Sequence, residues 1–243
     1  MTYHNRHECK FVVPEAIAAR MLQRATPFVE LDVHAAQRSN HGYPVASLYL
    51  DDARGSLYQE TIEGMASRYK LRVRSYTDEP AAPVFLEVKR RHDRVVQKLR
   101  CAVPRALLPG LLSGRVTEVP GLSPRERASL AEFLRLVQLR RAVPRCLVRY
   151  ERQAFVDREQ DDVRLTFDRR LSAMPHEDPT VRVHDARYAT VPAGGVVLEL
   201  KFTDRCPPWM LDSVRACELH RCSFSKYCRS VDALTSLGQV QGL

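Results

Sequence analysis

The sequence predicts an α+β domain in which about eight antiparallel strands close into a barrel, with helices packed on its outside. Short segments of alternating apolar and polar residues dominate the first half of the chain. Clear helix signals follow in the second half. On strand after strand, the charged side chains share one parity. The 243 residues fit one large core, so we expect a single domain over 1–243.

The first half reads as an antiparallel meander. Strands are expected at 8–13, 46–52, 67–76, 84–90 and 95–103, with an early helix at about 14–24. Turn-rich sequence such as DEPAAP at 78–83 separates the later strands.

The second half begins with a helix whose N-terminus is predicted by capping residues. Ser123 can cap it, Pro124 fits its first turn, and Glu126 completes a capping box. We expect this helix to end near Arg141. Three strands follow at 145–156, 162–169 and 196–202, and a polar stretch of about 171–195 separates the last two. Two helices, at 207–219 and 225–237, close the chain.

The composition points to an anionic partner and a reducing compartment. Lys and Arg number 38 against 29 Asp and Glu, a formal charge of +9, which suits nucleic acid, an acidic membrane surface or a phosphorylated small molecule. The N-terminus lacks a signal-peptide core, and no run approaches the roughly 18 apolar residues of a membrane span. Seven cysteines without a CxxC pair fit a cytoplasmic location. We interpret the group Cys217, His220, Cys222 and Cys228 as ordinary packing rather than zinc ligands.

The charged strand faces carry the functional argument. For any one strand, a solvated outer face explains the pattern. Its repetition over six or seven strands instead favours a closed barrel whose apolar face packs outward on helices and whose charged face lines a basic tunnel. The residues that share these faces are Glu8 with Lys10, Lys70 with Arg72 and Arg74, Glu87 with Lys89, Lys98 with Arg100, Tyr150 with Arg152, Arg164, and Glu199 with Lys201.

Such a lumen needs an anionic occupant. Two like charges about 4 Å apart repel by roughly 4 kcal/mol at an effective dielectric near 20, and the few carboxylates cannot neutralise about ten cations. A chain of phosphates suits guanidinium and ammonium groups, and a carboxylate among them makes sense if it holds Mg²⁺ or Mn²⁺ against the same phosphates.

An ordered set of segments resembles the VTC-type polyphosphate polymerase domain of the triphosphate tunnel metalloenzyme superfamily, also called CYTH-like. The segments are RHECKF at 6–11, SLYLD at 47–51, KLRVR at 70–74, LEVKRR at 86–91, the Lys98 strand, RYERQAF at 149–155, VRLTFD at 163–168, LELKF at 198–202 and SFSKY at 223–227. The resemblance implies an antiparallel tunnel barrel that binds triphosphate or polyphosphate with a divalent metal.

The resemblance also implies roles for single residues. The catalytic candidates are Lys226, Arg72, Arg74 and Arg152. The substrate-binding candidates are Lys10, Lys70, Lys89, Lys98, Tyr150, Arg164, Lys201 and Ser225. The metal-binding candidates are Glu199 and Glu8. Ser225 and Lys226 open a helix, where a capping hydroxyl and free N–H groups also suit an anion.

The implied activity is metal-dependent transfer of the terminal phosphate of ATP, or another nucleoside triphosphate, to polyphosphate. The first strand reads Arg6, Glu8, Lys10 where the cyclase and thiamine triphosphatase branch has ExExK, which favours the polymerase branch. A tripolyphosphate or nucleoside-triphosphate hydrolase, and a non-catalytic polyphosphate-binding module, stay open as alternatives. Nucleic acid is not expected, because aromatic residues do not alternate regularly with basic ones. A membrane partner protein is left open.

Overall fold

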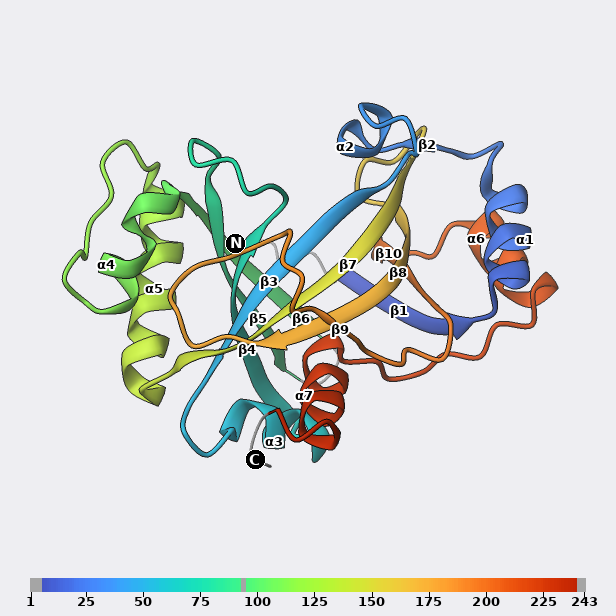
Figure 1. Cartoon of the computed structure of the whole chain (residues 1–243). Helices are drawn as coiled ribbons and strands as arrows, with labels where there is room; N and C mark the ends of the chain where they lie inside the picture. Colours follow the sequence, from blue (N-terminus) through green and yellow to red (C-terminus); the bar gives the residue numbers. More distant parts are fainter. Residues whose placement is uncertain (1–5, 93–94, 240–243) are drawn as a thin grey trace. The chain divides into compact units, whose positions relative to one another are not determined.

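The computed structural model describes residues 6–92 and 95–239, and Figure 1 labels their elements. The strands are β1 (Arg6–Val13), β2 (Val29–Leu31), β3 (Tyr43–Asp51), β4 (Ser67–Ser75), β5 (Val84–His92), β6 (Val95–Val103), β7 (Val143–Asp157), β8 (Arg164–Pro175), β9 (Ala189–Thr190) and β10 (Val196–Thr203). The helices are α1 (Glu15–Ala25), α2 (Val33–Ala36), α3 (Ser56–Ile62), the 3₁₀ turn η1 (Arg105–Leu107), α4 (Leu108–Leu112), α5 (Pro124–Arg140), α6 (Pro208–Ala216) and α7 (Lys226–Ser236).

The strands form one antiparallel sheet that does not close. Its order is β1-β10-β8-β7-β3-β4-β5-β6, with β2 beside β7 and β9 beside β8. Among the described residues, β1 and β6 end this order and do not pair with each other. The prediction of a closed barrel is therefore wrong, although the α+β class is right. Alternation of apolar and polar residues is the same in an open and a closed sheet, so it could not decide between them.

Contacts divide the chain into two compact units, which we describe separately. The first unit comprises 1–44, 150–171 and 192–225, and the second comprises 45–149, 172–191 and 226–243, each as far as it is described. The expectation of a single domain over 1–243 stays a prediction.

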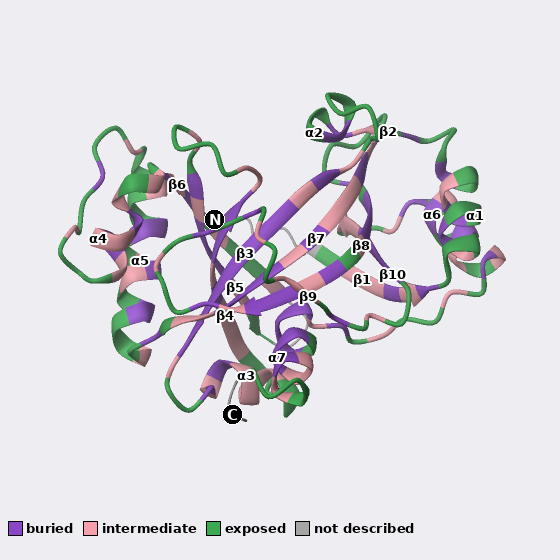
Figure 2. Cartoon of the chain, viewed as in Figure 1, coloured by how far each residue is buried: buried purple, intermediate pink, exposed green. Residues whose placement is uncertain are grey.

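The second unit has a core on one face of β3–β6. Leu48, Leu71, Val73 and Leu86 are almost completely buried there. Helix α5 covers this face and contacts β5 and β6. Buried residues such as Phe133 alternate along α5 with exposed ones (Figure 2). The parity that carries the apolar residues is thus used for packing, and the opposite parity is left for charge.

The first unit repeats this arrangement with β1, β8 and β10. Phe11, Leu165, Phe167 and Leu198 are buried in one cluster. Helices α1 and α6 contact each other, and buried residues of both, such as Met21, join the same cluster. Here too the apolar parity faces the helices.

The strongest helix signal is confirmed in detail. Ser123 accepts a hydrogen bond from the backbone N–H of Glu126, and the Glu126 side chain accepts one from the backbone of Ser123. The helix ends where Arg141 adopts the left-handed conformation. No helix within 6–92 and 95–239 is long and apolar enough to cross a membrane.

Candidate functional site

The face of β3–β6 opposite the core collects charged side chains in the second unit. We call it the cationic face: Ser47, Tyr49, Lys70, Arg72, Arg74, Phe85, Glu87, Lys89, Lys98 and Arg100. The strand register sets its rows. Tyr49, Arg72, Glu87 and Arg100 lie opposite one another across four strands.

Glu87 is the centre of this face and is fully buried. Its Oε2 atom accepts from Arg72 Nε at 2.7 Å and lies 3.8 Å from Arg74 Nη1. Its Oε1 atom lies 2.7 Å from Lys98 Nζ and 3.6 Å from Arg100 Nε. One carboxylate thus holds four cationic side chains, which leaves three positive charges in the group when Lys98 is protonated.

The charges of this group shift one another's ionisation. Burial alone would raise the pKa of Glu87, but Arg74, Arg72 and Lys98 outweigh it and hold that pKa well below its ordinary value. Loss of hydration lowers the pKa of Lys98 to about 7, although 39% of its side chain is exposed. Arg74 and Arg72 lower this pKa as well, whereas Glu87 raises it. An added anion would relieve this repulsion.

The next row of the face consists of three lysines. Lys70 on β4 lies opposite Lys89 on β5, which lies opposite Lys98 on β6. Like charges directly opposite each other destabilise a sheet. The row therefore extends the positive potential beyond the group around Glu87.

Helix α7 brings Lys226, which is buried, to the same unit. The ring of the next residue, Tyr227, stacks on Tyr49 with centroids 4.8 Å apart. The Tyr49 hydroxyl in turn accepts from Arg72 Nη1 at 3.3 Å. Tyr227 thereby sets the first turn of α7 against the row that contains Arg72.

Two tyrosine–aspartate hydrogen bonds hold α7 in place. Tyr227 donates to Asp51 at 2.8 Å, and Tyr58 of α3 donates to Asp232 of α7 at 2.6 Å. Asp51 is fully buried and also accepts from backbone N–H groups, including that of Leu57. Burial raises the pKa of Asp51 more than its hydrogen bonds lower it.

The first unit has a charged cluster of its own, centred on Arg152. Arg152 makes a bidentate contact with Asp168, with Nε–Oδ1 and Nη2–Oδ2 both at 2.7 Å. Its Nη2 atom lies 3.5 Å from Glu199 Oε2. Burial acts to lower the pKa of Arg152, but Asp168 and then Tyr150 and Glu199 outweigh it and raise it well above its ordinary value.

Glu199 joins two lysines to this cluster. Lys201 Nζ donates to Glu199 Oε2 at 2.6 Å, and Lys10 Nζ lies 3.7 Å from Oε1. Lys10 also lies 3.3 Å from Glu8 and donates to the carbonyl of Phe224 at 2.9 Å. Burial lowers the pKa of Lys201.

The two charged groups differ in net charge. Arg152, Lys10 and Lys201 balance Asp168, Glu199 and Glu8, so the first-unit cluster sums to zero. The expectation that cations greatly exceed carboxylates thus fits the second unit and not this cluster. The carboxylate of Asp168 makes this cluster neutral. Asp168 lies at the same parity of β8 as Arg164, but the sequence argument gave it no role.

The remaining predicted residues lie around the two groups. Tyr150 is buried, and the guanidinium carbon of Arg152 lies 5.2 Å from its ring centroid. Arg164 is exposed and lies opposite Lys201 in the register of β8 and β10. Ser225 is half-buried and directly precedes α7.

Two candidates for metal binding meet at one cation. Glu8 and Glu199 both contact Lys10, but no group of three or more His, Cys, Asp or Glu side chains in the described residues is arranged to hold a metal. Cys217, which the sequence argument interpreted as packing, is buried in the first-unit core.

Sequence reasoning placed Glu87 and Arg100 on charged faces but gave neither a role. The signal was present: Glu87 is the only acid among the cations of β4, β5 and β6 at this parity. Asp51 and Asp168 were missed as well. Each follows a predicted strand pattern at the charged parity, as part of SLYLD and VRLTFD.

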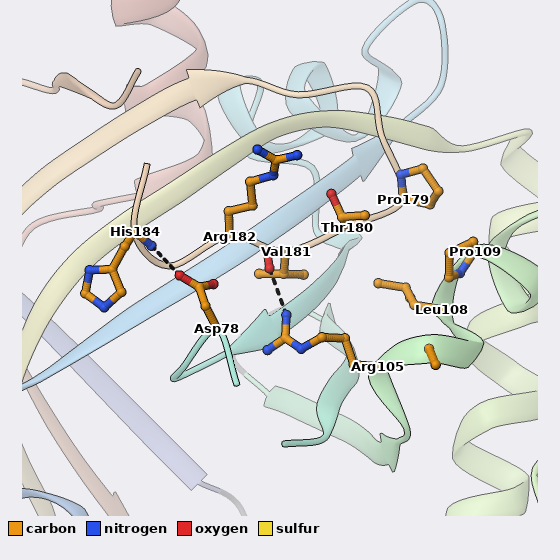
Figure 3. A pocket seen from close by; sticks show the side chains of 10 residues that line it. Asp78, Arg105, Leu108, Pro109, Pro179, Thr180, Val181, Arg182 and His184 are labelled. Carbon is orange, nitrogen blue, oxygen red and sulfur yellow. Dashed lines mark hydrogen bonds between the residues drawn. The ribbon is translucent and has the colours of Figure 1, made fainter. Parts of the chain in front are cut away.

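A cavity of about 520 Å³ lies elsewhere in the second unit (Figure 3). Arg105 and Asp78 line this cavity. Arg105 donates a hydrogen bond to the carbonyl of Val181, and Asp78 accepts one from the backbone N–H of His184, so both hold the segment 179–184 in place. None of the cationic face lines this cavity.

Comparison with known proteins gives a family and a fold. A family model described as the VTC domain matches residues 5–235. A search of curated proteins gave no match. Among solved structures, a proposed adenylate cyclase from Bacillus halodurans matches with a TM-score of 0.50 and 9% identity, over 91% of this chain and 95% of that one. At this identity the likeness concerns the fold alone.

Proposed function

Because the chain belongs to the VTC domain family, we propose that it transfers the terminal phosphate of a nucleoside triphosphate to the end of a polyphosphate chain. The observation that carries this proposal is the group around Glu87, where four cations share one buried carboxylate. Its excess positive charge, and the lysine row beside it, suit a chain of phosphates.

In this proposal Arg72 and Arg74 hold the donor triphosphate. Guanidinium groups bind phosphate oxygens in a fixed bidentate geometry, and Glu87 keeps both side chains in place before substrate arrives. Lys70, Lys89 and Lys98 add ammonium groups to further phosphates. Charge that spreads over the transferred phosphoryl group in the transition state is then stabilised without reorganisation.

Lys226 and Ser225 contact the transferred phosphate in this proposal. The stacking of Tyr227 on Tyr49 supports this role, because Tyr49 also accepts a hydrogen bond from Arg72 and the stack therefore fixes the start of α7 near Arg72. A terminal oxygen of the acceptor phosphate attacks the γ-phosphorus, the bond to the β-phosphate oxygen breaks, and the nucleoside diphosphate leaves with the electron pair. The acceptor is itself the nucleophile, so no side-chain nucleophile is needed.

In this proposal the first unit has phosphate ligands of its own, namely Lys10, Tyr150, Arg152, Arg164 and Lys201. Glu199 and Glu8 would hold a divalent metal in this proposal, since Mg²⁺ commonly takes one or two carboxylates and completes its shell with water and substrate phosphates. When bound, Mg²⁺ or Mn²⁺ would neutralise charge on the phosphates.

The test is incubation with ATP and Mn²⁺, followed by electrophoresis stained for polyphosphate. Lys226→Ala, Arg74→Ala and Arg152→Ala are compared with the parent. We expect long products from the parent and their loss in the variants. Free phosphate without long products would instead indicate a hydrolase of the same family, and binding of tripolyphosphate without turnover would indicate a binding module.

A further inference from the structure

We infer that Arg100, Phe85 and Tyr76 form a stacking site for the base of a nucleotide at one end of the cationic face. This inference rests on the proposed function, because it assigns the base of the nucleotide whose phosphates that face would hold. It starts from an exception in the strand pattern. Phe85 has the same parity as Glu87 and Lys89 on β5, so a large aromatic ring lies on an otherwise polar face.

The ring of Phe85 is not part of the core. It is half-buried and does not belong to the buried cluster on the other face of β4–β6. Its partner in register on β6 is Ala102, which has a small side chain. Arg100, two residues before Ala102 on the same strand, places its guanidinium carbon 3.8 Å from the centroid of the Phe85 ring.

Arg100 therefore presents a planar cation that already lies over an aromatic ring. Its guanidinium lies over Phe85, while 37% of its side chain is exposed. Nucleobases stack on aromatic rings and on guanidinium planes, and the interaction tolerates different bases. A base that stacks on the Arg100 guanidinium would continue the contact that Phe85 begins.

Tyr76, the residue that follows β4, adds a second aromatic ring to the contact between Arg100 and Phe85. Its ring meets Phe85 edge to face, with centroids 5.7 Å apart at 65°. Arg74 and Arg100 outweigh the effect of burial and lower the pKa of the Tyr76 hydroxyl. Two aromatic rings and two guanidinium groups thus meet here.

The position beside phosphate ligands distinguishes this group from other arginine–aromatic contacts. Phe85 lies directly opposite Arg74 in the strand register, and Arg100 Nε lies 3.6 Å from Glu87. A nucleoside triphosphate combines an aromatic base with an anionic chain. The cationic face offers a matching pair of surfaces within neighbouring residues.

The test compares two ligands that share the triphosphate and differ in the nucleoside. Binding of adenosine 5′-(β,γ-imido)triphosphate and of tripolyphosphate is measured by calorimetry at one Mg²⁺ concentration. Phe85→Leu removes the ring and keeps an apolar side chain. Arg100→Lys keeps the charge and removes the plane. Arg140→Lys is the matched control, because Arg140 also lies over a ring, that of Tyr69, at 5.5 Å, on the core parity of β4.

We expect the first two variants to weaken nucleotide binding about fivefold or more and tripolyphosphate binding less than twofold. Arg140→Lys should change neither. Equal weakening of both ligands, or no weakening of either, would overturn the base site and leave the phosphate face standing. If the parent binds neither ligand, the proposed function fails and the inference fails with it. Melting temperatures establish that each variant is folded. If Phe85→Leu does not fold, the comparison of the two ligands with Arg100→Lys tests the base site.

Discussion

Replacing Glu87 by Gln removes the one negative charge that holds four cations together. The side chain keeps its size, so the change tests charge rather than packing. The two shortest contacts of Glu87, to Arg72 and to Lys98, are both 2.7 Å. A hydrogen bond to a charged group contributes about 1.5–3 kcal/mol, and the amide of Gln can keep only a weaker version of one. We therefore expect the free energy of unfolding to fall by about 3–5 kcal/mol, as for a broken buried ion pair.

The assay is urea unfolding followed by circular dichroism, with Glu132→Gln as the matched control. Glu132 on α5 also pairs with two arginines, Arg90 and Arg135, but 22% of its side chain is exposed. We expect the control to lose less than about 1 kcal/mol. A loss for Glu87→Gln no larger than for the control would refute the role of Glu87 as the organising charge.

Tripolyphosphate should compensate for the missing carboxylate. In Glu87→Gln the arginines Arg72, Arg74 and Arg100 keep their positive charge and lack their internal counter-ion, so the ligand should raise the melting temperature of the variant more than that of the parent. An equal or smaller shift in the variant would mean that the ligand does not contact this group.

Three further outcomes follow from the ionisation and hydrogen bonding of the second unit. The depressed pKa of Glu87 contributes stability above the ordinary carboxyl pKa of about 4.3, and this stability is lost as the pH falls toward the folded-state pKa. The free energy of unfolding of the parent, measured in urea, should therefore fall below about pH 4.5, and it should depend less steeply on pH in Glu87→Gln. Because the pKa of Lys98 is lowered to about 7, tripolyphosphate affinity should fall as pH rises through 7, and Lys98→Arg should flatten that fall in calorimetry; an unchanged profile would contradict it. Tyr227→Phe should cost about 1–3 kcal/mol in urea unfolding, because the buried Asp51 loses a donor, whereas no measurable loss would show that this hydrogen bond does not anchor α7.

Local patterns predicted the eight longer strands and the helices α1, α5, α6 and α7, but not the short elements β2, β9, α2, α3 and α4. The alternation of Leu71 and Val73 with Arg72 and Arg74 placed β4 and assigned its two faces, because side-chain direction in a strand has a period of two. The Ser123 capping box placed the start of α5, since its hydrogen bonds join residues three apart.

Long-range features could not be obtained in the same way. Closure of the sheet would have required hydrogen bonds between β1 and β6, about 90 residues apart in the chain, and neither strand's sequence encodes its partner. The pairing of Arg152 with Asp168 depends on the register of β7 and β8, so the neutral balance of the first-unit cluster became visible only in three dimensions. The family resemblance was confirmed, whereas the roles of individual site residues remain proposals.

The central claim is that the cationic face binds a chain of phosphates. The most direct measurement is the shift in melting temperature caused by tripolyphosphate, compared with single-stranded RNA of equal phosphate concentration, in the parent and in Arg74→Gln. We predict a large rise with tripolyphosphate that Arg74→Gln strongly reduces, because a ligand that binds only the folded state stabilises it. Stabilisation by RNA but not by tripolyphosphate, or an undiminished shift in Arg74→Gln, would contradict the claim.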